Sequence, residues 1–388
     1  MTELPIYMDH NATTPLDPRV FDAMRPYFME MFGNAASRGH IFGWDAEAAV
    51  DRARQQVATL LNARPDAIVW TSGATESNNL AIKGVAESYV HRGRHIITQV
   101  TEHKAVLDPC KRVEQRGYDV TFLSVDRFGR IDLDELRDSI RADTILVSIM
   151  WANNAIGTIQ EIRQIGQMCH ERGVLFHTDA TQAVGKVLID VEADHIDLLS
   201  MSGHKMYGPK GCGCLFVRNK PRKIELTPIL DGGGHERGYR SGTLNVPGVV
   251  GVGAASEIAG YAVADEIPRL QTLRDRLQNG IMSQIDGVRV NGYDANRLPH
   301  MTNLAFDGVD HDELPAGLFG IAISSGSACT CASLEPSYVL VALGLDRRRA
   351  FSSLRFSLGK GNTIPEVDFV IDRLSRAVGK LRGQPARG

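Results

Sequence analysis

The sequence predicts an α/β fold in which helices cover both faces of a mostly parallel sheet. Short apolar runs rich in β-branched and aliphatic residues alternate with amphipathic helical patterns through the first two thirds of the chain. Most of the runs are apolar on both faces, as in strands that are buried from both sides. Such alternation is typical of α/β proteins. The expected strands are residues 67–71, 95–100, 120–125, 144–150, 174–178, 196–201 and 214–217, and the helical patterns include residues 133–141 and 162–172.

A second, smaller unit follows the alternating region. The chain has 388 residues, which suggests two structural units at roughly 100–200 residues per domain. After about Gly260 the pattern changes to one long helix, three short strands and a final helix, typical of an α+β unit. These elements are expected at residues 267–285, 288–291, 302–306, 321–324 and 365–381. We therefore expect a large domain of residues 15–260 and a small domain made of residues 1–14 and 261–388.

Composition excludes several classes of protein. The 43 Lys and Arg residues nearly balance the 46 Asp and Glu residues, so the basic excess of a nucleic-acid-binding surface is missing. No run of about 18 apolar residues predicts a membrane span, and the N-terminus lacks the pattern of a secretory signal. Six cysteines are too few for a disulfide framework in a chain of this length. We expect a cytoplasmic protein with reduced thiols that binds neither nucleic acid nor membrane directly.

Two of the expected strands end in residues that could bind a ligand. The strand at 67–71 leads into a segment in which Gly73 permits a tight turn and Thr75 is expected to cap a helix. The N-terminus of such a helix can bind a phosphate, although an ordinary capped helix is the alternative. Asp179 follows the strand at 174–178, where a buried carboxylate is costly unless it meets a cation. The alternative for Asp179 is a helix N-cap.

Lys205 follows the expected strand at 196–201, and lysines are rarely buried. Desolvation lowers the pKa of a lysine and makes the amine a nucleophile that can form an imine with an aldehyde, although a solvated loop lysine is the alternative. A phosphate cradle, a carboxylate for a ring nitrogen and an imine-forming lysine together indicate pyridoxal phosphate. His103 follows another strand and could stack on the ring, or could be an ordinary core histidine.

Two further features carry chemistry. Small and polar residues surround Cys329 and Cys331, which indicates an exposed loop whose thiol can ionise, although two incidental cysteines are the alternative. The other four cysteines are expected to be structural. Arg355 is a single cation in an apolar, strand-like segment. It could grip a substrate carboxylate, or form a structural ion pair.

At these residues the chain resembles cysteine desulfurases of the NifS/IscS type, enzymes with the aminotransferase-like fold (fold type I) of pyridoxal-phosphate enzymes. The resemblance covers nearly the whole chain, and the order of the motifs, together with the Ser-Gly-Ser-Ala-Cys-Thr loop, makes it very specific. The matching motifs span residues 7–15, 73–79, 153–157, 177–182, 202–205, 233–237, 241–243 and 325–336.

The resemblance implies a role for each matching residue. Lys205 would carry the cofactor through an imine bond, Asp179 would pair with the ring nitrogen, and Gln182 would contact the ring oxygen. His103 would stack on the ring and move protons. The other cofactor-binding residues would be Ala74, Thr75, Asn154, Ser202, Gly203 and His204, with Thr243 reaching the phosphate of the other subunit in a homodimer.

The resemblance also implies the reaction and its partners. Asn154 and Arg355 would bind the carboxylate of L-cysteine. Cys329, in a loop of about residues 324–336, would take the sulfur as a persulfide and leave L-alanine. The persulfide would supply an iron–sulfur scaffold protein and other acceptors, including those of tRNA thiolation. Cys329 would also be a transient ligand of an iron–sulfur cluster, of the 2Fe-2S kind, shared with the scaffold.

The sequence departs from the family pattern at Cys331, where the family usually has a small residue such as serine. Two neighbouring thiols permit a local disulfide, which leaves open which thiol carries sulfur. Two alternatives to the desulfurase remain. One is another lyase or transferase on this fold, such as a selenocysteine lyase, and the other is a docking scaffold for iron–sulfur assembly. The intact set of Lys205, Asp179 and His103 argues against a scaffold without catalysis.

Overall fold

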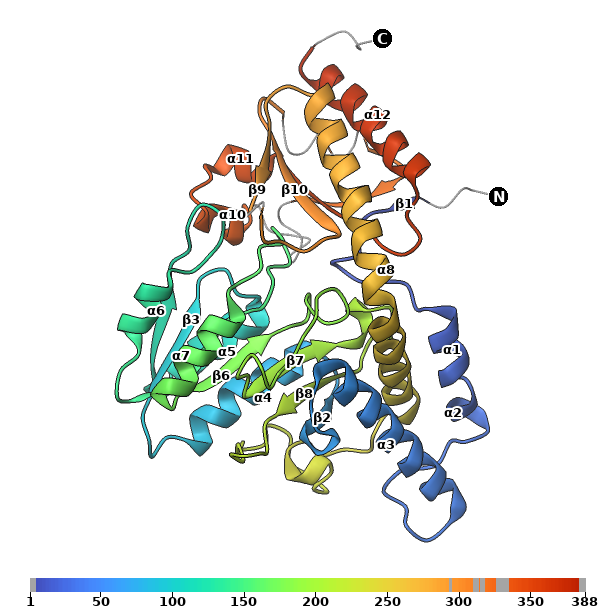
Figure 1. Cartoon of the computed structure of the whole chain (residues 1–388), viewed down its shortest axis with the longest axis vertical. Coiled ribbons are helices and arrows are strands. Elements are labelled where there is room, and N and C mark those ends of the chain that lie inside the picture. The colour runs from blue at the N-terminus through green and yellow to red at the C-terminus, as the bar shows by residue number, and fades with distance from the viewer. Residues whose placement is uncertain (1–4, 293–294, 310–313, 315–317, 326–334, 384–388) are drawn as a thin grey trace.

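Seven strands form the central sheet of the computed structural model (Figure 1), which describes residues 5–292, 295–309, 314, 318–325 and 335–383. Their order is β2-β8-β7-β6-β5-β3-β4. Only β8 runs antiparallel to its neighbours in this sheet. The bounds are β2 Ile68–Thr71, β3 His95–Gln99, β4 Asp119–Leu123, β5 Thr144–Ser148, β6 Leu175–Asp179, β7 Leu198–Ser202 and β8 Gly213–Val217. The predicted mostly parallel sheet is confirmed, with all seven strands where the sequence indicates them.

The sheet is buried on both faces because successive residues of its strands enter different hydrophobic cores. In β7, for example, Leu199 belongs to the core that includes helices α3, α7 and α8, whereas Leu198 belongs to the core under α4 and α5. This is why the strands are apolar throughout and do not alternate with polar residues. The helices that flank this sheet are α3 Ile41–Leu61, α4 Ala74–Ser88, α5 Lys104–Glu114, α6 Leu133–Ser139 and α7 Ile162–Arg172.

A second, antiparallel sheet of order β12-β13-β10-β9 is built from the C-terminal part of the chain. Its strands are β9 Val288–Asn291, β10 Met301–Phe306, β12 Ser324–Ser325 and β13 Ser353–Ser357. The single strand expected at 321–324 is instead two strands, because the chain changes partner at Ile323. β11 Ile321–Ala322 pairs in parallel with β1 Ile6–Tyr7, and β12 pairs with β13. The N-terminus is therefore joined to the C-terminal part of the chain.

Helix α8, Val246–Gln284, extends from the large sheet to the small one (Figure 1). The sequence predicted a start at residue 267, which is wrong. The missed part is rich in glycine, a poor helix former, yet close packing requires these small residues. A Cβ on Gly253 would lie 2.6 Å from the Cα of Ala53 in α3. By length and hydropathy alone α8 is also a candidate membrane span, but 56% of that segment is buried inside the protein, as in a core helix.

The remaining elements connect these layers. α12 packs beside the C-terminal part of α8 (Figure 1), and apolar side chains of both helices share a core with the small sheet. Three single-turn 3-10 helices occupy loops, and one of them contains Lys205. The bounds are α1 Pro18–Met24, α2 Pro26–Met29, α10 Tyr338–Ala342, α11 Arg347–Phe351, α12 Ile364–Leu381, η1 Pro65–Ala67, η2 Gly203–Lys205 and η3 Glu236–Gly238.

The close packing at the first residue of β8 generates a prediction. A Cβ on Gly213 would lie 2.4 Å from the carbonyl oxygen of Met201 and 2.7 Å from the Cα of Gly73, both backbone atoms that cannot rotate away. Gly213→Ala should therefore lower the free energy of unfolding by about 1–3 kcal/mol, measured by urea denaturation. Gly361→Ala is the control, because nothing lies within 4 Å of its added Cβ. Equal urea midpoints for the two variants would contradict the packing described here.

Candidate active site

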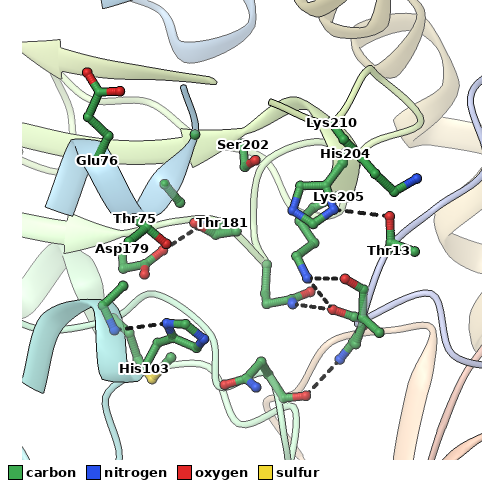
Figure 2. A pocket seen from close by; sticks show the side chains of 18 of the residues that line it. Thr13, Thr75, Glu76, His103, Asp179, Thr181, Ser202, His204, Lys205 and Lys210 are labelled. Carbon is green, nitrogen blue, oxygen red and sulfur yellow. Dashed lines mark hydrogen bonds between the residues drawn. The ribbon is translucent and has the colours of Figure 1, made fainter. Parts of the chain in front are cut away.

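A cavity of about 590 Å³ opens at the carboxyl ends of the parallel strands, where open α/β sheets usually bind their ligands. One part of it is lined by the end of β6 and by residues that follow β2, β3, β5 and β7. The N-terminal segment and β13 of the small sheet line the rest. Figure 2 shows Asp179 and Thr75 on one side of this space and Lys205 and His204 on the other. The cavity thus brings together residues that are far apart in the sequence.

The N-terminus of α4 presents free donors to the cavity. Gly73 is the N-cap, with a φ of 145° that non-glycine residues rarely adopt, and no side chain caps the helix. The prediction that Thr75 caps it is wrong, because the helix already begins at Ala74 and Thr75 lies inside its first turn. The backbone N–H groups of Ala74, Thr75 and Glu76 have no acceptor among the described residues, so they can bind an anion.

Asp179, the last residue of β6, is buried without a cationic partner among the described residues. Its Oδ2 accepts a hydrogen bond of 2.7 Å from Nδ2 of Asn78, and its Oδ1 accepts one of 3.0 Å from the backbone N–H of Thr181. Neutral donors therefore hold the carboxylate in place, and its charge remains available to a cationic group in the cavity. The turns that follow Asp179 are not a helix, so it is not the helix N-cap considered above.

The amine of Lys205 is held by the beginning of the chain. η2 follows β7 directly, and Lys205 at its end is half-buried. Its Nζ donates to the carbonyl oxygens of Asn11 and Ala12, both at 2.6 Å. Both acceptors are neutral carbonyl groups, and they orient the amine. The amine thus lies at the cavity wall in the position expected of a nucleophile.

His204 and Ser202 add neutral polar groups to the cavity wall (Figure 2). Burial, and then the positive charges of Lys205, Lys210 and Lys186, lowers the pKa of His204 to about 4. The imidazole is therefore neutral at pH 7, and its Nδ1 forms a hydrogen bond of 3.1 Å with Oγ1 of Thr13. The Ser202 hydroxyl has no hydrogen-bond partner among the described residues, so both side chains can contact an anion without a full positive charge.

His103 lies across the cavity from Lys205 and is the N-cap of α5. Its Nδ1 accepts a hydrogen bond of 3.1 Å from the backbone N–H of Ala105. In the neutral ring this bond places the proton on Nε2, because Nδ1 must keep its lone pair. The tautomer is thus set by the helix N-terminus, and Nε2 is the atom that can exchange a proton with a bound molecule.

Arg355 forms both an ion pair and part of the cavity wall. In β13 its Nη2 lies 2.7 Å from Oδ1 of Asp9 and donates to Oγ of Ser324, and its Nη1 donates to the carbonyl oxygen of Asn154. The structural ion pair and the cavity position are therefore both present. Nε is buried with no partner in the described parts of the chain, so this guanidinium keeps donors for a carboxylate.

Some predicted residues are not among the described residues that line this cavity. Cys329, Cys331 and most of the predicted loop of residues 324–336 lie outside the described residues. Gly203 is buried behind the cavity wall, and Thr243 is exposed outside the lining. The other four cysteines are buried, and burial raises the pKa of each thiol, which agrees with the structural role predicted for them. These four are Cys110, Cys169, Cys212 and Cys214.

Residues without an assigned role also line the cavity. Asn11 and Ala12 lie in a motif that the sequence shares with the family, but nothing local indicates that their carbonyl groups bind an amine 193 or 194 residues away. Thr181 lies in another shared motif, and its hydroxyl is buried without a partner among the described residues. Lys210 adds a further positive charge. The shared motifs were the only signal for the first three, since their contacts are long-range.

The donor set fits the predicted pyridoxal phosphate. The open N-terminus of α4, with Ser202 and neutral His204, can hold the phosphate. The carboxylate of Asp179 can hold a protonated ring nitrogen, and the amine of Lys205 can bind the aldehyde. The unpartnered Thr181 hydroxyl is a further donor for a polar group of the ligand.

Comparisons with known proteins identify the family of the chain. Residues 6–370 match the aminotransferase class-V family. The cysteine desulfurase IscS of Anaeromyxobacter sp. (strain Fw109-5) is 54% identical over 380 residues, 98% of this chain and 94% of that protein. A solved structure described as a NifS-like protein is 37% identical, with a TM-score of 0.90 over 97% of this chain and all of the other. SspA in complex with cysteine is 38% identical, with a TM-score of 0.80 over 91% and 98% of the two chains.

Proposed function

The chain belongs to the cysteine desulfurases of the aminotransferase class-V family, and from this premise we propose how its cavity turns L-cysteine into L-alanine and transferable sulfur. It is a pyridoxal-phosphate-dependent enzyme. One observation carries the proposal: Lys205, Asp179 and the open N-terminus of α4 surround a single cavity. An amine, a carboxylate and an anion site are what this cofactor needs for attachment, for ring protonation and for phosphate binding.

The cofactor, when bound, supplies an electron sink for negative charge on the substrate. The residues of the chain do the rest. Asp179 would keep the ring nitrogen protonated, and Gln182 would hold the ring oxygen. His103 would lie against the ring, and its Nε2 is the atom that would move a proton. Ala74, Thr75, Ser202 and His204 line the cavity and would hold the phosphate, with Gly203 buried behind them.

Arg355 and Asn154 are proposed to bind the substrate carboxylate. Nη2 of Arg355 is committed to Asp9 and Ser324, and one Nη1 hydrogen to the carbonyl of Asn154. Nε is buried without a partner among the described residues, so its N–H remains as a donor for one oxygen of a carboxylate. The Asn154 side chain also faces the cavity without a partner among the described residues. Asp9 therefore orients the guanidinium without using all of its donors.

Cys329 is proposed to accept the sulfur. Its thiolate attacks the sulfur atom of the substrate, a new S–S bond forms, and the C–S bond breaks. The electron pair of the broken bond stays with the carbon, which then takes a proton to give alanine. Cys329 is left as a persulfide, and a low thiol pKa or an exposed position favours this chemistry.

The amine of Lys205 provides the first test of the function. The wild-type protein should show the visible absorbance of a pyridoxal imine, and borohydride should fix the cofactor on the peptide carrying Lys205. Lys205→Ala should lose the imine and reduce alanine production by roughly 10²–10⁴-fold, the usual contribution of a positioned acid–base group. The control is Lys210→Ala, which removes the neighbouring amine and should keep the visible band. Cofactor fixed on Lys210, or full activity of Lys205→Ala, would contradict the assignment.

The two loop thiols can be separated in a second test. Cys329→Ala should still bind L-cysteine and change the visible spectrum, because Lys205 and Asp179 are intact, yet release little alanine. Cys331→Ser should keep most of the activity when a reductant is present. Mass spectrometry after one turnover should find the additional sulfur on Cys329. An inactive Cys331→Ser variant beside an active Cys329→Ala variant would identify the other thiol as the acceptor.

We propose that the enzyme is a homodimer. Large exposed apolar side chains are concentrated in one stretch of the chain, where a second copy could cover them. They are Phe21, Phe28, Met29, Phe32, Ile41, Phe42 and Trp44. Thr243 is exposed and outside its own cavity, which supports a role at the phosphate site of the partner subunit.

Mixed dimers test the contribution of Thr243. Lys205→Ala removes the amine of one site, and Thr243→Ala removes a phosphate contact that belongs to the other subunit. In a hybrid dimer of these two chains, one site has both residues intact, so co-refolding should restore activity above either parent. The Lys205→Ala chain refolded alone is the control. Hybrids with no more activity than the averaged parents would show that Thr243 does not act across subunits.

The sulfur acceptors and location are proposed from the IscS type of the relatives. An iron–sulfur scaffold protein, and acceptors for tRNA thiolation, would take the persulfide in the cytoplasm, without direct binding of nucleic acid or membrane. Cys329 would be a transient ligand of a 2Fe-2S cluster on the scaffold. Residues 15–260 would act as the large cofactor-binding domain, and residues 1–14 and 261–388 as the small domain that carries the thiol loop. The two would be joined through α8.

A further inference from the structure

Lys186 is a lysine near Lys205 to which the proposed reaction gives no role. It lies in the turns after β6, and its Nζ donates a hydrogen bond of 3.0 Å to Oε1 of Gln182. Both lysines line a small cavity of about 40 Å³ behind the active site. No ion pair joins Lys186 to a carboxylate in the described ranges of the chain. Its amine thus forms a hydrogen bond with the active-site glutamine and no ion pair with a described carboxylate.

A continuous set of hydrogen bonds connects the two lysines. Nε2 of Gln182 donates to the carbonyl oxygen of Asn11 at 3.0 Å. The same oxygen accepts the bond of 2.6 Å from Nζ of Lys205. The amide of Gln182 therefore lies between Lys186 and the acceptor of the reactive amine, and it also lines the main cavity.

While Lys186 is protonated, the donor and acceptor properties of these groups allow only one orientation of the amide. A charged ammonium can only donate, and a backbone carbonyl can only accept. If the amide of Gln182 were reversed, two donors would meet at Lys186 and two acceptors would meet at Asn11. We propose that Lys186 is a positioning residue that holds the Gln182 amide with Nε2 toward the active site. The remaining N–H of Nε2 is then available to an oxygen atom of the cofactor, so this inference rests on the proposed function.

The charge of Lys186 has a second consequence. Burial, followed by repulsion from Lys205 and Arg355, lowers the pKa of its amine to about 7. Repulsion is mutual, so a charged Lys186 disfavours an additional proton on the nitrogen of Lys205. Titratable and charged groups surround Lys186 from several elements: the N-terminal segment, η2, α8, β13 and the segments that flank the small sheet. They include His10, His204, Lys205, Glu266, His300, Arg355 and Lys360.

Several of these charges are already paired, Arg355 with Asp9 and Lys360 with Asp17. Glu266 is the carboxylate among them, and it forms an ion pair with Arg269. Burial lowers the pKa of His10 to about 4 and lowers that of His300, so both rings are neutral at pH 7. Lys186 itself forms no ion pair among the described residues, so removal of its charge should be measurable at Lys205.

The experiment compares three substitutions at Lys186 in the full-length holoenzyme. Two readouts are used: the pH midpoint of the visible imine band, and the dissociation constant of pyridoxal phosphate. Lys186→Met removes both charge and hydrogen bond. It should raise the midpoint by about 1 pH unit and weaken cofactor binding about 3- to 10-fold. Lys186→Gln keeps a donor without charge, so it should raise the midpoint with a smaller loss of binding. Lys186→Arg keeps both properties and should restore both values.

The matched control is Lys223→Met. It also removes one positive charge from the protein, but from an exposed lysine, so it should change neither readout. Wild-type midpoint and affinity in Lys186→Met would overturn the inference. Circular dichroism reports folding, and failure of all three Lys186 variants to fold would also overturn it, because Lys186 would then be structural. If the wild-type protein has no visible band, the proposed function fails. A wild-type band that responds to none of the substitutions refutes the role of Lys186 alone.

Discussion

Two hydrogen bonds from the Lys205 amine to the carbonyl oxygens of Asn11 and Ala12 connect the end of β7 to the beginning of the chain. The active site depends on this connection, because the N-terminal segment is also tied to the small sheet through β1 and β11. A carboxylate in place of the carbonyls would form an ion pair and keep the amine charged. The two carbonyl groups orient the amine and bring no full negative charge to it, and a lysine held in this way can act as a nucleophile.

Asp179, on the other side of the cavity, is also held by neutral partners. Asp179 was expected to require a cation, because it ends a buried strand. Instead Asn78 and the backbone of Thr181 donate to it. These neutral donors offset part of the desolvation cost and leave the full charge for the ring nitrogen of the cofactor. Arg355 differs, since Asp9 balances its charge while Nε is left without a partner in the described residues. The contacts that fix Asp179 and Arg355 thus leave the charge of the carboxylate, and one donor of the guanidinium, for a ligand.

The sequence predicted the large sheet well because its strands are buried on both faces, and a continuous apolar run is a local signal. It failed at α8, where glycines that disfavour a helix are required by the contact with α3. Likewise, threonine is a residue type that often caps helices, but the turn at Gly73 makes this helix begin at Ala74, one residue before Thr75. The site residues with local signatures, Asp179 and Lys205, were predicted. Contacts of Asn11 and Lys186 were not, because they depend on how distant segments meet.

The distribution of charge in the cavity also explains why cofactor binding and folding should be coupled. Lys205, Lys210 and Arg355 line it together, with Lys186 behind them, whereas Asp179 and Glu76 are the carboxylates of the lining. Glu76 is already paired with Arg240. The phosphate of the cofactor and the carboxylate of the substrate supply negative charge where like charges otherwise repel each other. A ligand that binds only the folded state stabilises it by about 2.7 kcal/mol at 100 times its dissociation constant. The positive cavity that orients the reaction is therefore also a means by which the cofactor stabilises the fold.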